Sequence, residues 1–306
     1  MVTVYATITD MIGKLIEWLR LGAALLLLLL NTIVHVLPVL LLALLKLLLP
    51  LQVVRKVLDH ALILLAESWI GINSLALDAS TSTRIEVDGL PEVDRGGHYL
   101  VLCNHQSWVD IPVLQKLCNR RLPFMRFFLK QQLIWVPLLG LGWWALDFPF
   151  MRRHSKQQLA SNPKLAGRDL AATRRACQKF RNIPVSIMNF VEGTRFTDAK
   201  HDRQQSPFVH LLKPRSGGTA LVLDALSDCI DTIIDVTMVY PHGRPGLMQY
   251  LANQVPEIRV HMRTLQVPDA LRGGDYQDDA EFRQRFQQWL NRLWQDKDQR
   301  IQRILD

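Results

Sequence analysis

Cysteine is scarce in this chain of 306 residues, which contains only four. They are Cys103, Cys118, Cys177 and Cys229, and no two of them form a CxxC pair or a spacing typical of a disulfide framework. This scarcity excludes a disulfide-stapled scaffold and a cysteine-based zinc site. We expect the four to be ordinary small apolar residues in a protein of a reducing compartment.

Acidic residues are in the minority. The chain has 28 Asp and Glu against 36 Lys and Arg, which leaves a formal net charge of +8. This excess favours an anionic partner, and charge alone leaves nucleic acid, a membrane surface and a phosphorylated substrate open. Hydrophobic residues make up 49% of the chain, which excludes a disordered chain and allows a substantial core.

Charge is almost missing from residues 21–50, "LGAALLLLLLNTIVHVLPVLLLALLKLLLP", where Lys46 is the only formally charged residue. About 20 apolar residues suffice to span a bilayer as a helix, so we expect this segment to lie in lipid. The apolar run is longer than the core of a signal peptide, and no small-x-small cleavage site closes it. A cleavable signal peptide is therefore disfavoured.

The path of this segment through the membrane stays open between a single crossing and a shallow hairpin. Polar residues and a proline interrupt it midway, at Asn31, His35 and Pro38. Basic residues flank both of its ends, which favours the hairpin with both ends on the cytoplasmic side. The flanking residues are Lys14, Arg20, Lys46, Arg55 and Lys56.

Residues 51–77 keep apolar side chains mostly at helical spacing with charges between them. This pattern fits an amphipathic helix at the membrane interface, and equally a helix packed on the globular domain. We therefore expect an N-terminal membrane-anchoring part over residues 1–80, and a second domain over residues 81–306 that ends in a long helix.

Strands and helices alternate after residue 80. The predicted strands are 98–104, 124–129, 147–151, 183–191, 232–240 and 257–265. The predicted helices are 110–117, 131–146, 167–182, 217–226 and one that begins near Asp279. This order predicts an α/β domain with a central mixed sheet flanked by helices.

The stretch "VLCNHQSWVD" (101–110) combines a strand end with a helix start. Ser107 and Asp110 have the spacing of a capping box, in which Asp110 would bond back to the backbone of Ser107. His105 precedes the cap, so a carboxylate in the first helical turn can reach its imidazole. Two interpretations stay open here: a catalytic pair of His105 and Asp110, or a buried structural histidine beside a capped helix.

The stretch "NFVEGTRF" (189–196) also follows a predicted strand. It offers a carboxylate, a glycine, a hydroxyl and an arginine at Glu192, Gly193, Thr194 and Arg195. The planar fork of arginine matches the oxygens of a phosphate group, so this loop is a candidate phosphate clamp. Taken alone, the pattern also fits a turn with a surface salt bridge. A third basic strand end, "FMRR" (150–153), favours a site lined by basic residues.

At these residues the chain resembles the glycerolipid acyltransferases, the group of 1-acylglycerol-3-phosphate O-acyltransferases. "NHQSWVD" is similar to their NHxxxxD block and "FVEGTR" to their FxEGTR block. Residues 126–153 resemble the version found in lysocardiolipin acyltransferases and similar bacterial proteins. Two blocks depart from the family: "FMRR" stands where FIDR is usual, so only Phe150 and Arg153 carry over, and "DVTMVYP" (235–241) replaces a core rich in valine and proline.

The resemblance implies the glycerolipid acyltransferase fold and an O-acyltransferase at a membrane. It would move a fatty acyl group from acyl-CoA or acyl carrier protein to the free hydroxyl of a lysophospholipid, lysophosphatidic acid or a related anionic lysolipid, with no cofactor and no metal. His105 would be the base and Asp110 its orienting carboxylate. The acceptor would be bound by Arg195 with Glu192, Gly193, Thr194, Lys130 and Arg153 around it.

Three other functions lack sequence signals of their own. Nucleic-acid binding would use the basic stretch "TRRACQKFR" (173–181), which has no recognised binding motif and no interleaved aromatics, so we expect no nucleic-acid partner. A non-catalytic basic membrane scaffold would need neither His105 nor Asp110. A hydrolase using Ser107 or Ser186 would be expected to carry a GxSxG elbow, which does not occur. We expect the protein at the cytoplasmic membrane, on an anionic lipid surface, with residues 81–306 on the cytoplasmic side.

Overall fold

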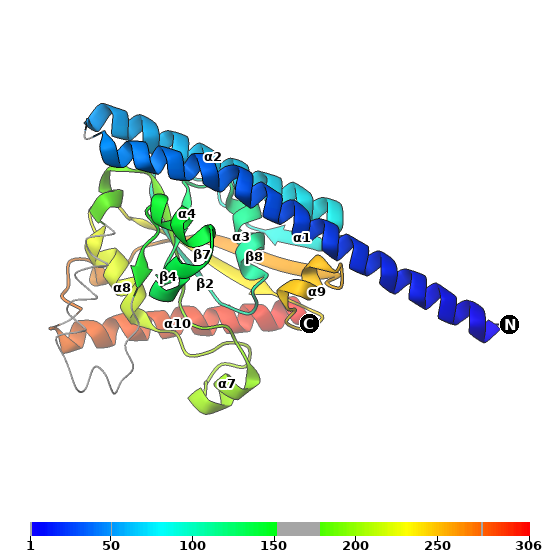
Figure 1. Ribbon diagram of the computed structural model, residues 1–306. Coiled ribbons are helices and arrows are strands. Elements are labelled where there is room, and N and C mark those ends of the chain that lie inside the picture. The colour runs from blue at the N-terminus through cyan, green and yellow to red at the C-terminus, as the bar shows by residue number, and fades with distance from the viewer. Residues whose placement is uncertain (1, 50, 152–177, 277) are drawn as a thin grey trace. The chain divides into compact units, whose positions relative to one another are not determined.

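The computed structural model describes residues 2–49, 51–151, 178–276 and 278–306. The helices of the described chain are α1 (Val2–Leu48), α2 (Gln52–Ser80), α3 (Asp110–Cys118), α4 (Leu139–Ala145), α7 (Asp198–Gln204), α8 (Ser216–Ala225), α9 (Leu247–Leu251) and α10 (Ala280–Leu305). The 3-10 segments are η1 (Gln131–Trp135), η2 (Lys179–Asn182) and η3 (Asp269–Leu271). The strands are β1 (Arg84–Asp88), β2 (His98–Cys103), β3 (Met125–Phe127), β4 (Leu129–Lys130), β5 (Phe150–Met151), β6 (Val185–Phe190), β7 (Thr232–Val239) and β8 (Glu257–Gln266), as Figure 1 shows.

The chain divides into two compact units. The first comprises Met1–Glu86, Ser107–Lys116 and Tyr240–Ile258, and the second comprises Val87–Gln106, Leu117–Val239 and Arg259–Asp306. Each unit is therefore built from segments that are far apart in the sequence. α2 ends at Ser80, and the predicted division into residues 1–80 and 81–306 stays a prediction.

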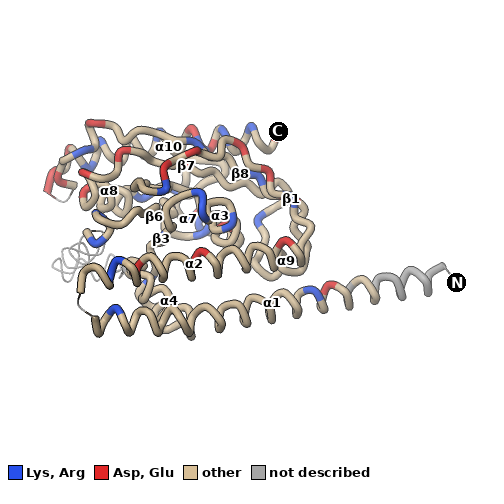
Figure 2. The backbone as a smooth tube through the Cα atoms, turned by 90° about the horizontal axis from the view of Figure 1, so that it is seen from above, with Lys and Arg blue, Asp and Glu red and all other residues tan. Residues whose placement is uncertain are grey.

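The first unit contains two long helices that lie side by side. α1 and α2 run in opposite directions, and the C-terminal part of α1 packs against α2 (Figures 1 and 2). Leucine dominates α1, and leucine is a strong helix former that loses little side-chain freedom in a helix. Figure 2 shows few charged positions along the described part of α1. Met11–Leu48 and Gln52–Ser80 are both long and apolar enough to cross a membrane.

Of the two paths left open for residues 21–50, the structure does not form the shallow hairpin within the segment. α1 continues through Pro38 to Leu48, and the chain reverses between α1 and α2. A proline inside a helix removes one backbone hydrogen bond but does not require the chain to reverse. The hairpin of this protein is therefore formed by α1 and α2 together.

Polar side chains in the middle of α1 form hydrogen bonds with residues of α2. Asn31 donates through Nδ2 to the backbone oxygen of Trp69 at 3.0 Å and to Oδ1 of Asn73 at 2.7 Å. His35 bonds through Nδ1 to the Asn31 oxygen at 2.9 Å and through Nε2 to Ser68 Oγ at 3.1 Å. An unpaired polar group in an apolar environment costs several kcal/mol, so these bonds stabilise the pairing of the helices at this depth.

The other segments of the first unit pack at the end of α2. The backbone nitrogen of Arg84 donates to the Pro256 oxygen at 2.9 Å, and Lys116 forms an ion pair with Asp78. Tyr250 of α9 is 1% exposed, and its hydroxyl is hydrogen-bonded to Thr81. Burial, and to a smaller extent the charge of Asp78, raise the pKa of Tyr250 to about 12. These contacts join α3 to the C-terminal end of α2, and join the segment 240–258 to the residues just beyond that end.

The central sheet has the strand order β1-β8-β7-β2-β6-β3. β2 is parallel to both β6 and β7, β3 is parallel to β6, and β8 is antiparallel to β7. The predicted mixed α/β sheet is therefore confirmed, as are the predicted strands at 98–104, 183–191, 232–240 and 257–265. The buried positions of β2 read YLVLC and those of β7 read IIDVTMV, which is the near-continuous apolar pattern expected of strands covered on both faces.

Helices α8 and α10 cover the sheet of the second unit. Their apolar side chains join those of β2, β6 and β7 in one core, with the fully buried Trp294 of α10 among them. α10 begins where the sequence predicts, because the side chain of Asp279 accepts hydrogen bonds from the backbone nitrogens of Glu281 and Phe282. The predicted helices 110–117 and 217–226 are confirmed as α3 and α8.

Three predicted elements differ from the structure. Residues 131–146 form η1 and α4 instead of one helix, because Pro137 lacks an amide hydrogen and the following Leu138 has φ 62°. Residues 124–129 divide between β3 and β4, and 147–151 contribute only β5, which pairs with β4 in a separate two-stranded sheet. The predicted helix 167–182 falls largely outside the described residues, and its last four form η2. The sequence analysis missed α7 and α9.

Candidate active site

The two motifs singled out in the sequence follow neighbouring parallel strands. In the register of β2 with β6, Cys103 lies opposite Phe190, so "NHQSWVD" and "EGTR" both begin at the carboxyl edge of the sheet. A further backbone bond, from the Val191 nitrogen to the Cys103 oxygen at 3.3 Å, continues the pairing beyond the strands. The carboxyl ends of parallel strands are where α/β proteins commonly bind ligands. The register of β2 with β6 therefore places the beginnings of both motifs at the same edge of the sheet.

His105 is half-buried at this edge. Its ring stacks on the ring of Phe190, with a centroid distance of 3.9 Å and an angle of 15°. Its backbone oxygen accepts a bond from the Phe196 nitrogen at 2.8 Å, which ties His105 to the end of the EGTR loop. Both contacts restrict the imidazole to one region of the site, as a catalytic base requires.

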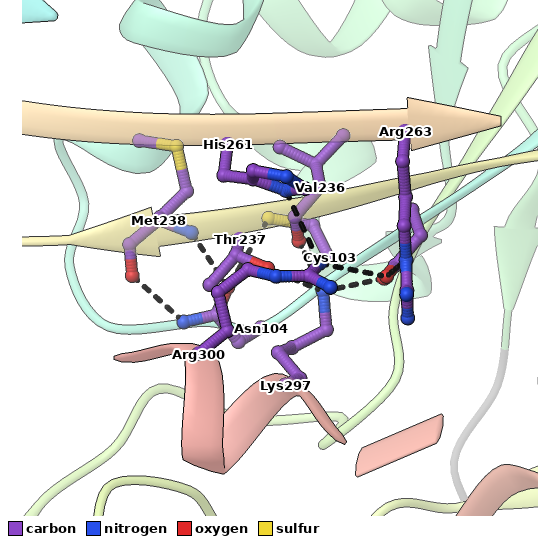
Figure 3. A network of polar contacts seen from close by, with 10 residues as sticks. Cys103, Asn104, Val236, Thr237, Met238, His261, Arg263, Lys297 and Arg300 are labelled. Carbon is purple, nitrogen blue, oxygen red and sulfur yellow. Dashed lines mark hydrogen bonds and ion pairs between the residues drawn. The ribbon is translucent and has the colours of Figure 1, made fainter. Parts of the chain in front are cut away.

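Asn104, the residue before His105, is fully buried and pairs with the backbone of β7. Its Nδ2 donates to the Met238 oxygen and its Oδ1 accepts from the Met238 nitrogen, both at 2.9 Å (Figure 3). A side-chain amide that bonds to both the N–H and the C=O of one residue pairs with that residue as the backbone of a neighbouring strand would. This fixes the chain where it leaves β2 and turns into the motif. The sequence analysis did not assign Asn104 this part.

Asp110 is the first residue of α3 and is fully buried. Its Oδ2 accepts a bond from the backbone nitrogen of Ser107 at 3.0 Å, which confirms the half of the predicted capping box in which Asp110 bonds back to Ser107. The Ser107 hydroxyl instead accepts from the Val109 nitrogen at 3.0 Å. The other carboxylate oxygen, Oδ1, accepts from the hydroxyl of Tyr240 at 2.6 Å.

His105 belongs to the second unit and Asp110 to the first. Their pairing stays a prediction.

The EGTR loop makes a tight turn. The backbone nitrogen of Gly193 donates to the Phe190 oxygen at 2.8 Å, and Gly193 has φ 70°, a conformation that side chains with a Cβ rarely adopt. Glu192 is fully buried, whereas Thr194 and Arg195 are half-buried. The turn therefore directs the carboxylate inward and leaves the hydroxyl and the guanidinium partly accessible.

Lys200 of α7 holds this loop from outside the motif. Its Nζ donates to Thr194 Oγ1 at 2.9 Å and to the Arg195 backbone oxygen at 2.8 Å. Burial first, and then the positive charges of Arg195, Arg203 and Lys130, lower the pKa of Lys200 below its ordinary value. Arg195, Arg203 and Lys130 lie close enough to Lys200 for their charges to act on its ammonium, so these four cations form a positive cluster beside the loop.

The cluster brings together Arg195 and Lys130, two residues singled out in the sequence, and adds Lys200 and Arg203, which were missed. The sequence did contain a signal for Lys200. It stands in the first turn of α7, where a positive charge is unfavourable beside the helix dipole, so a lysine at this position suggests a role other than stabilising the helix. Arg153 lies outside the described residues.

The two serines considered as hydrolase nucleophiles occupy structural positions. Besides accepting a bond from Val109, the Ser107 hydroxyl donates to the Pro245 oxygen at 2.5 Å. Ser186 is fully buried within β6. Among the described residues, no group of three or more His, Cys, Asp or Glu side chains could hold a metal ion.

Comparison with a solved structure supports the same fold. A crystal structure of a 1-acyl-sn-glycerophosphate acyltransferase from Thermotoga maritima superposes with a TM-score of 0.51 over 92% of this chain and 97% of that one, at 16% sequence identity. At this identity the likeness concerns the fold alone, including the mixed sheet flanked by helices.

Curated sequences add relatives of the same kind. The 1-acyl-sn-glycerol-3-phosphate acyltransferase epsilon of Mus musculus is 24% identical over 231 residues, which cover 68% of this chain and 58% of that protein. The gamma protein of Homo sapiens is 26% identical over 222 residues, covering 67% and 54%. The chain thus matches just over half the length of these relatives.

The family model named Acyltransferase matches residues 84–241, which is more than half of the chain. The matched region runs from β1 to the residue after Tyr240, so it contains both strand-end motifs, the positive cluster and the segment that holds Asp110. On this match, the chain belongs to the acyltransferase family.

Proposed function

We propose that this protein transfers a fatty acyl group from an acyl thioester to the free hydroxyl of a lysophospholipid, with lysophosphatidic acid or a related anionic lysolipid as acceptor. The observation that carries the proposal is the placement of His105 and of the EGTR loop with its positive cluster at the carboxyl ends of the neighbouring parallel strands β2 and β6. Its relatives are named as acyltransferases of 1-acylglycerol phosphates, which supports this acceptor class. The closer resemblance to lysocardiolipin acyltransferases stays a prediction.

In the proposed reaction, His105 removes the proton from the acceptor hydroxyl as its oxygen attacks the thioester carbonyl. Collapse of the tetrahedral intermediate breaks the carbon–sulfur bond, and the proton passes from His105 to the departing thiolate. Asp110 accepts a hydrogen bond from one nitrogen of the imidazole. This fixes the tautomer in which the other ring nitrogen carries no proton and faces the hydroxyl. A base placed in this way contributes about 10²- to 10⁴-fold in rate. Coenzyme A or acyl carrier protein would carry the acyl group, and neither a metal nor an organic cofactor enters these steps.

The phosphate of the acceptor would bind at the positive cluster. Arg195 offers a planar pair of donors, and Lys200 and Lys130 add positive charge near it. Thr194 and Gly193 shape the loop, and Glu192 orders it from its buried position. Arg153 remains a further candidate for this role.

A panel of lysophospholipids with labelled acyl-CoA and acyl carrier protein tests the function, with products identified by mass spectrometry. His105→Ala should lower turnover by at least about 10²-fold, and Asp110→Asn should slow it severely because the tautomer is no longer enforced. His242, whose side chain is 61% exposed, provides a histidine control that should keep wild-type turnover when changed to Ala. A His105→Ala protein with wild-type turnover would refute the base assignment and favour a non-catalytic scaffold.

We further propose that the α1–α2 hairpin holds the protein in the cytoplasmic membrane, with the sheet domain on the cytoplasmic side. Large apolar side chains stand exposed along α1 at helical spacing, among them Leu37, Leu41 and Leu44, and likewise along α2 at Val53 and Val57. Removal of such a surface from water is worth about 25 cal/mol per Å². Cysteines introduced at positions 5 and 80 should both resist an impermeant thiol reagent added to intact cells, with the parent protein as background. Labelling of position 5 alone would show a single crossing and refute the hairpin topology.

A further inference from the structure

The hydroxyl of Tyr240 bonds to the candidate catalytic carboxylate. Tyr240 directly follows β7 and is 7% exposed, and its hydroxyl lies 2.6 Å from Asp110 Oδ1, although 130 residues separate the two in the sequence. Both residues belong to the first unit. A distance of 2.6 Å falls in the range typical of a hydroxyl that donates to a carboxylate.

The two oxygens of Asp110 have separate donors. Tyr240 holds Oδ1 from the side of β7, and the backbone nitrogen of Ser107 holds Oδ2 from within the same turn. An aspartate carboxylate can turn about its Cβ–Cγ bond when only one oxygen is bonded, whereas bonds to both oxygens restrict it to one orientation. The carboxylate is fully buried, so the loss of either donor removes a hydrogen bond from an oxygen that lies away from water.

The same segment fixes the second donor. The Ser107 hydroxyl donates to the Pro245 oxygen at 2.5 Å, five residues after Tyr240. Residues 240–245 therefore provide one donor to Asp110 directly and hold the residue that provides the other. The chain after β7 thus orients the carboxylate from both sides.

We propose that Tyr240 is a positioning residue for the reaction, acting by holding Asp110 in the orientation that its role requires. This proposal rests on the proposed function, in which Asp110 sets the tautomer of His105. Because Tyr240 acts through Asp110, it contributes to the chemical step and leaves the binding of both substrates unchanged.

Tyr240→Phe tests the proposal, since it removes one hydroxyl and keeps the ring. Loss of a residue that orients a metal ligand typically costs about 10- to 100-fold in activity. Tyr240 orients the candidate catalytic carboxylate in a similar way, so we expect kcat to fall by roughly 10-fold or more with both KM values within about 2-fold of the wild type. Tyr250→Phe is the matched control: Tyr250 is also buried in the first unit, but its hydroxyl bonds to Thr81. This control should retain wild-type kcat. A Tyr240→Phe protein with wild-type kcat would overturn the proposal.

A double variant separates a positioning role from a merely structural one. In an Asp110→Asn background, Tyr240→Phe should change kcat by less than about 2-fold, because the group through which it acts is already disabled. An undiminished loss in that background would overturn the proposal, since Tyr240 would then act elsewhere. Wild-type activity of Asp110→Asn alone would refute the proposed pairing of Asp110 with His105, and with it the role of Tyr240. An inactive Asp110→Asn protein beside a fully active Tyr240→Phe protein would refute only the role of Tyr240.

If the Tyr240→Phe protein does not fold, a fluorinated tyrosine at position 240 provides a second test of the proposal. It preserves the ring and the hydroxyl but loses its proton at a lower pH, after which it can no longer donate to Asp110. The decline of kcat at high pH should therefore begin at a lower pH than in the wild type. An unshifted pH profile in this folded variant would contradict the proposal.

Discussion

Replacement of Lys297 by Met should destabilise the second unit through one buried ion pair. Lys297 of α10 and Asp235 of β7 are both fully buried, and their charged atoms lie 2.6 Å apart. The Lys297 ammonium also donates to the Val236 oxygen at 2.5 Å and to Thr237 Oγ1 at 3.2 Å, as Figure 3 shows. Methionine has a similar unbranched length, so the change removes the charge and three polar contacts with little change of volume.

The expected loss of unfolding free energy depends on the partners that Asp235 retains in the Lys297→Met protein. Removal of one partner of a buried pair typically costs 3–5 kcal/mol, because the other charge is left in the interior. Arg263 still donates from Nε to Asp235 Oδ2 at 2.9 Å, and Arg300 lies 3.9 Å from the same oxygen. We therefore expect the lower end of the range, about 3 kcal/mol, which corresponds to a fall in Tm of roughly 6 to 12 °C.

The dependence of this loss on pH has a definite sign. Burial alone would raise the pKa of Asp235, but the charges and hydrogen bonds of Lys297 and Arg263 outweigh it and lower the pKa below its ordinary value. A carboxyl with a lowered folded-state pKa contributes stability that is present above its unfolded pKa, near 3.9, and disappears as the pH falls through the folded value. The difference between wild type and Lys297→Met should therefore be full at pH 7 and shrink below about pH 4.

Thermal and denaturant unfolding of the detergent-solubilised protein measures these differences. Arg181→Met is the matched control, because Arg181 and Asp228 form an ion pair at 3.1 Å whose side chains are 45% and 56% exposed. Such surface pairs contribute about 0–1 kcal/mol. In the double variant Asp235→Asn/Lys297→Met, the loss should be smaller than the sum of the two single losses. Additive losses, or a Lys297→Met protein no less stable than the Arg181→Met control, would refute the argument.

Two further predictions concern the positive cluster. Arg195→Lys keeps the charge but loses the fork, so the acceptor KM should rise several-fold with little change for the acyl donor; a change confined to the donor would move Arg195 to the coenzyme A side. Lys200→Met removes a charge and the bonds to Thr194 and Arg195, so the acceptor KM should rise by about 10-fold, while the exposed Arg203, changed to Met, should have less effect. Equal acceptor KM values for the two methionine variants would contradict a specific role of Lys200.

Local patterns were sufficient for most of the sheet and for both motifs. Runs of apolar and β-branched residues predicted β2, β6, β7 and β8, and the helix predicted to begin near Asp279 is α10. These elements are specified by their own residues and by burial on both faces. The prediction failed over 131–146, where apolar residues at helical spacing suggested one helix. There the backbone limits set by Pro137 outweigh the periodicity.

The partners that complete the site could not be predicted in this way. Asn104 bonds to Met238 and Asp110 to Tyr240, and in each case more than 100 residues separate the two partners. The contacts exist because β7 pairs with β2 in parallel, which is a property of the folded sheet. The local sequence around Tyr240 shows a departure from the family pattern but gives no sign of the carboxylate that its hydroxyl meets.

The segment "DVTMVYP" joins the stability of the fold to the geometry of the site. Asp235 attaches α10 through its side chain, Met238 pairs with Asn104 through its backbone alone, and Tyr240 bonds to Asp110 through its hydroxyl. A backbone pairing requires no particular side chain, whereas an ion pair and a hydroxyl bond do. The physical constraint on this block therefore falls on the chemical identity of residues 235 and 240, and at 238 only on the apolar character that a buried strand demands.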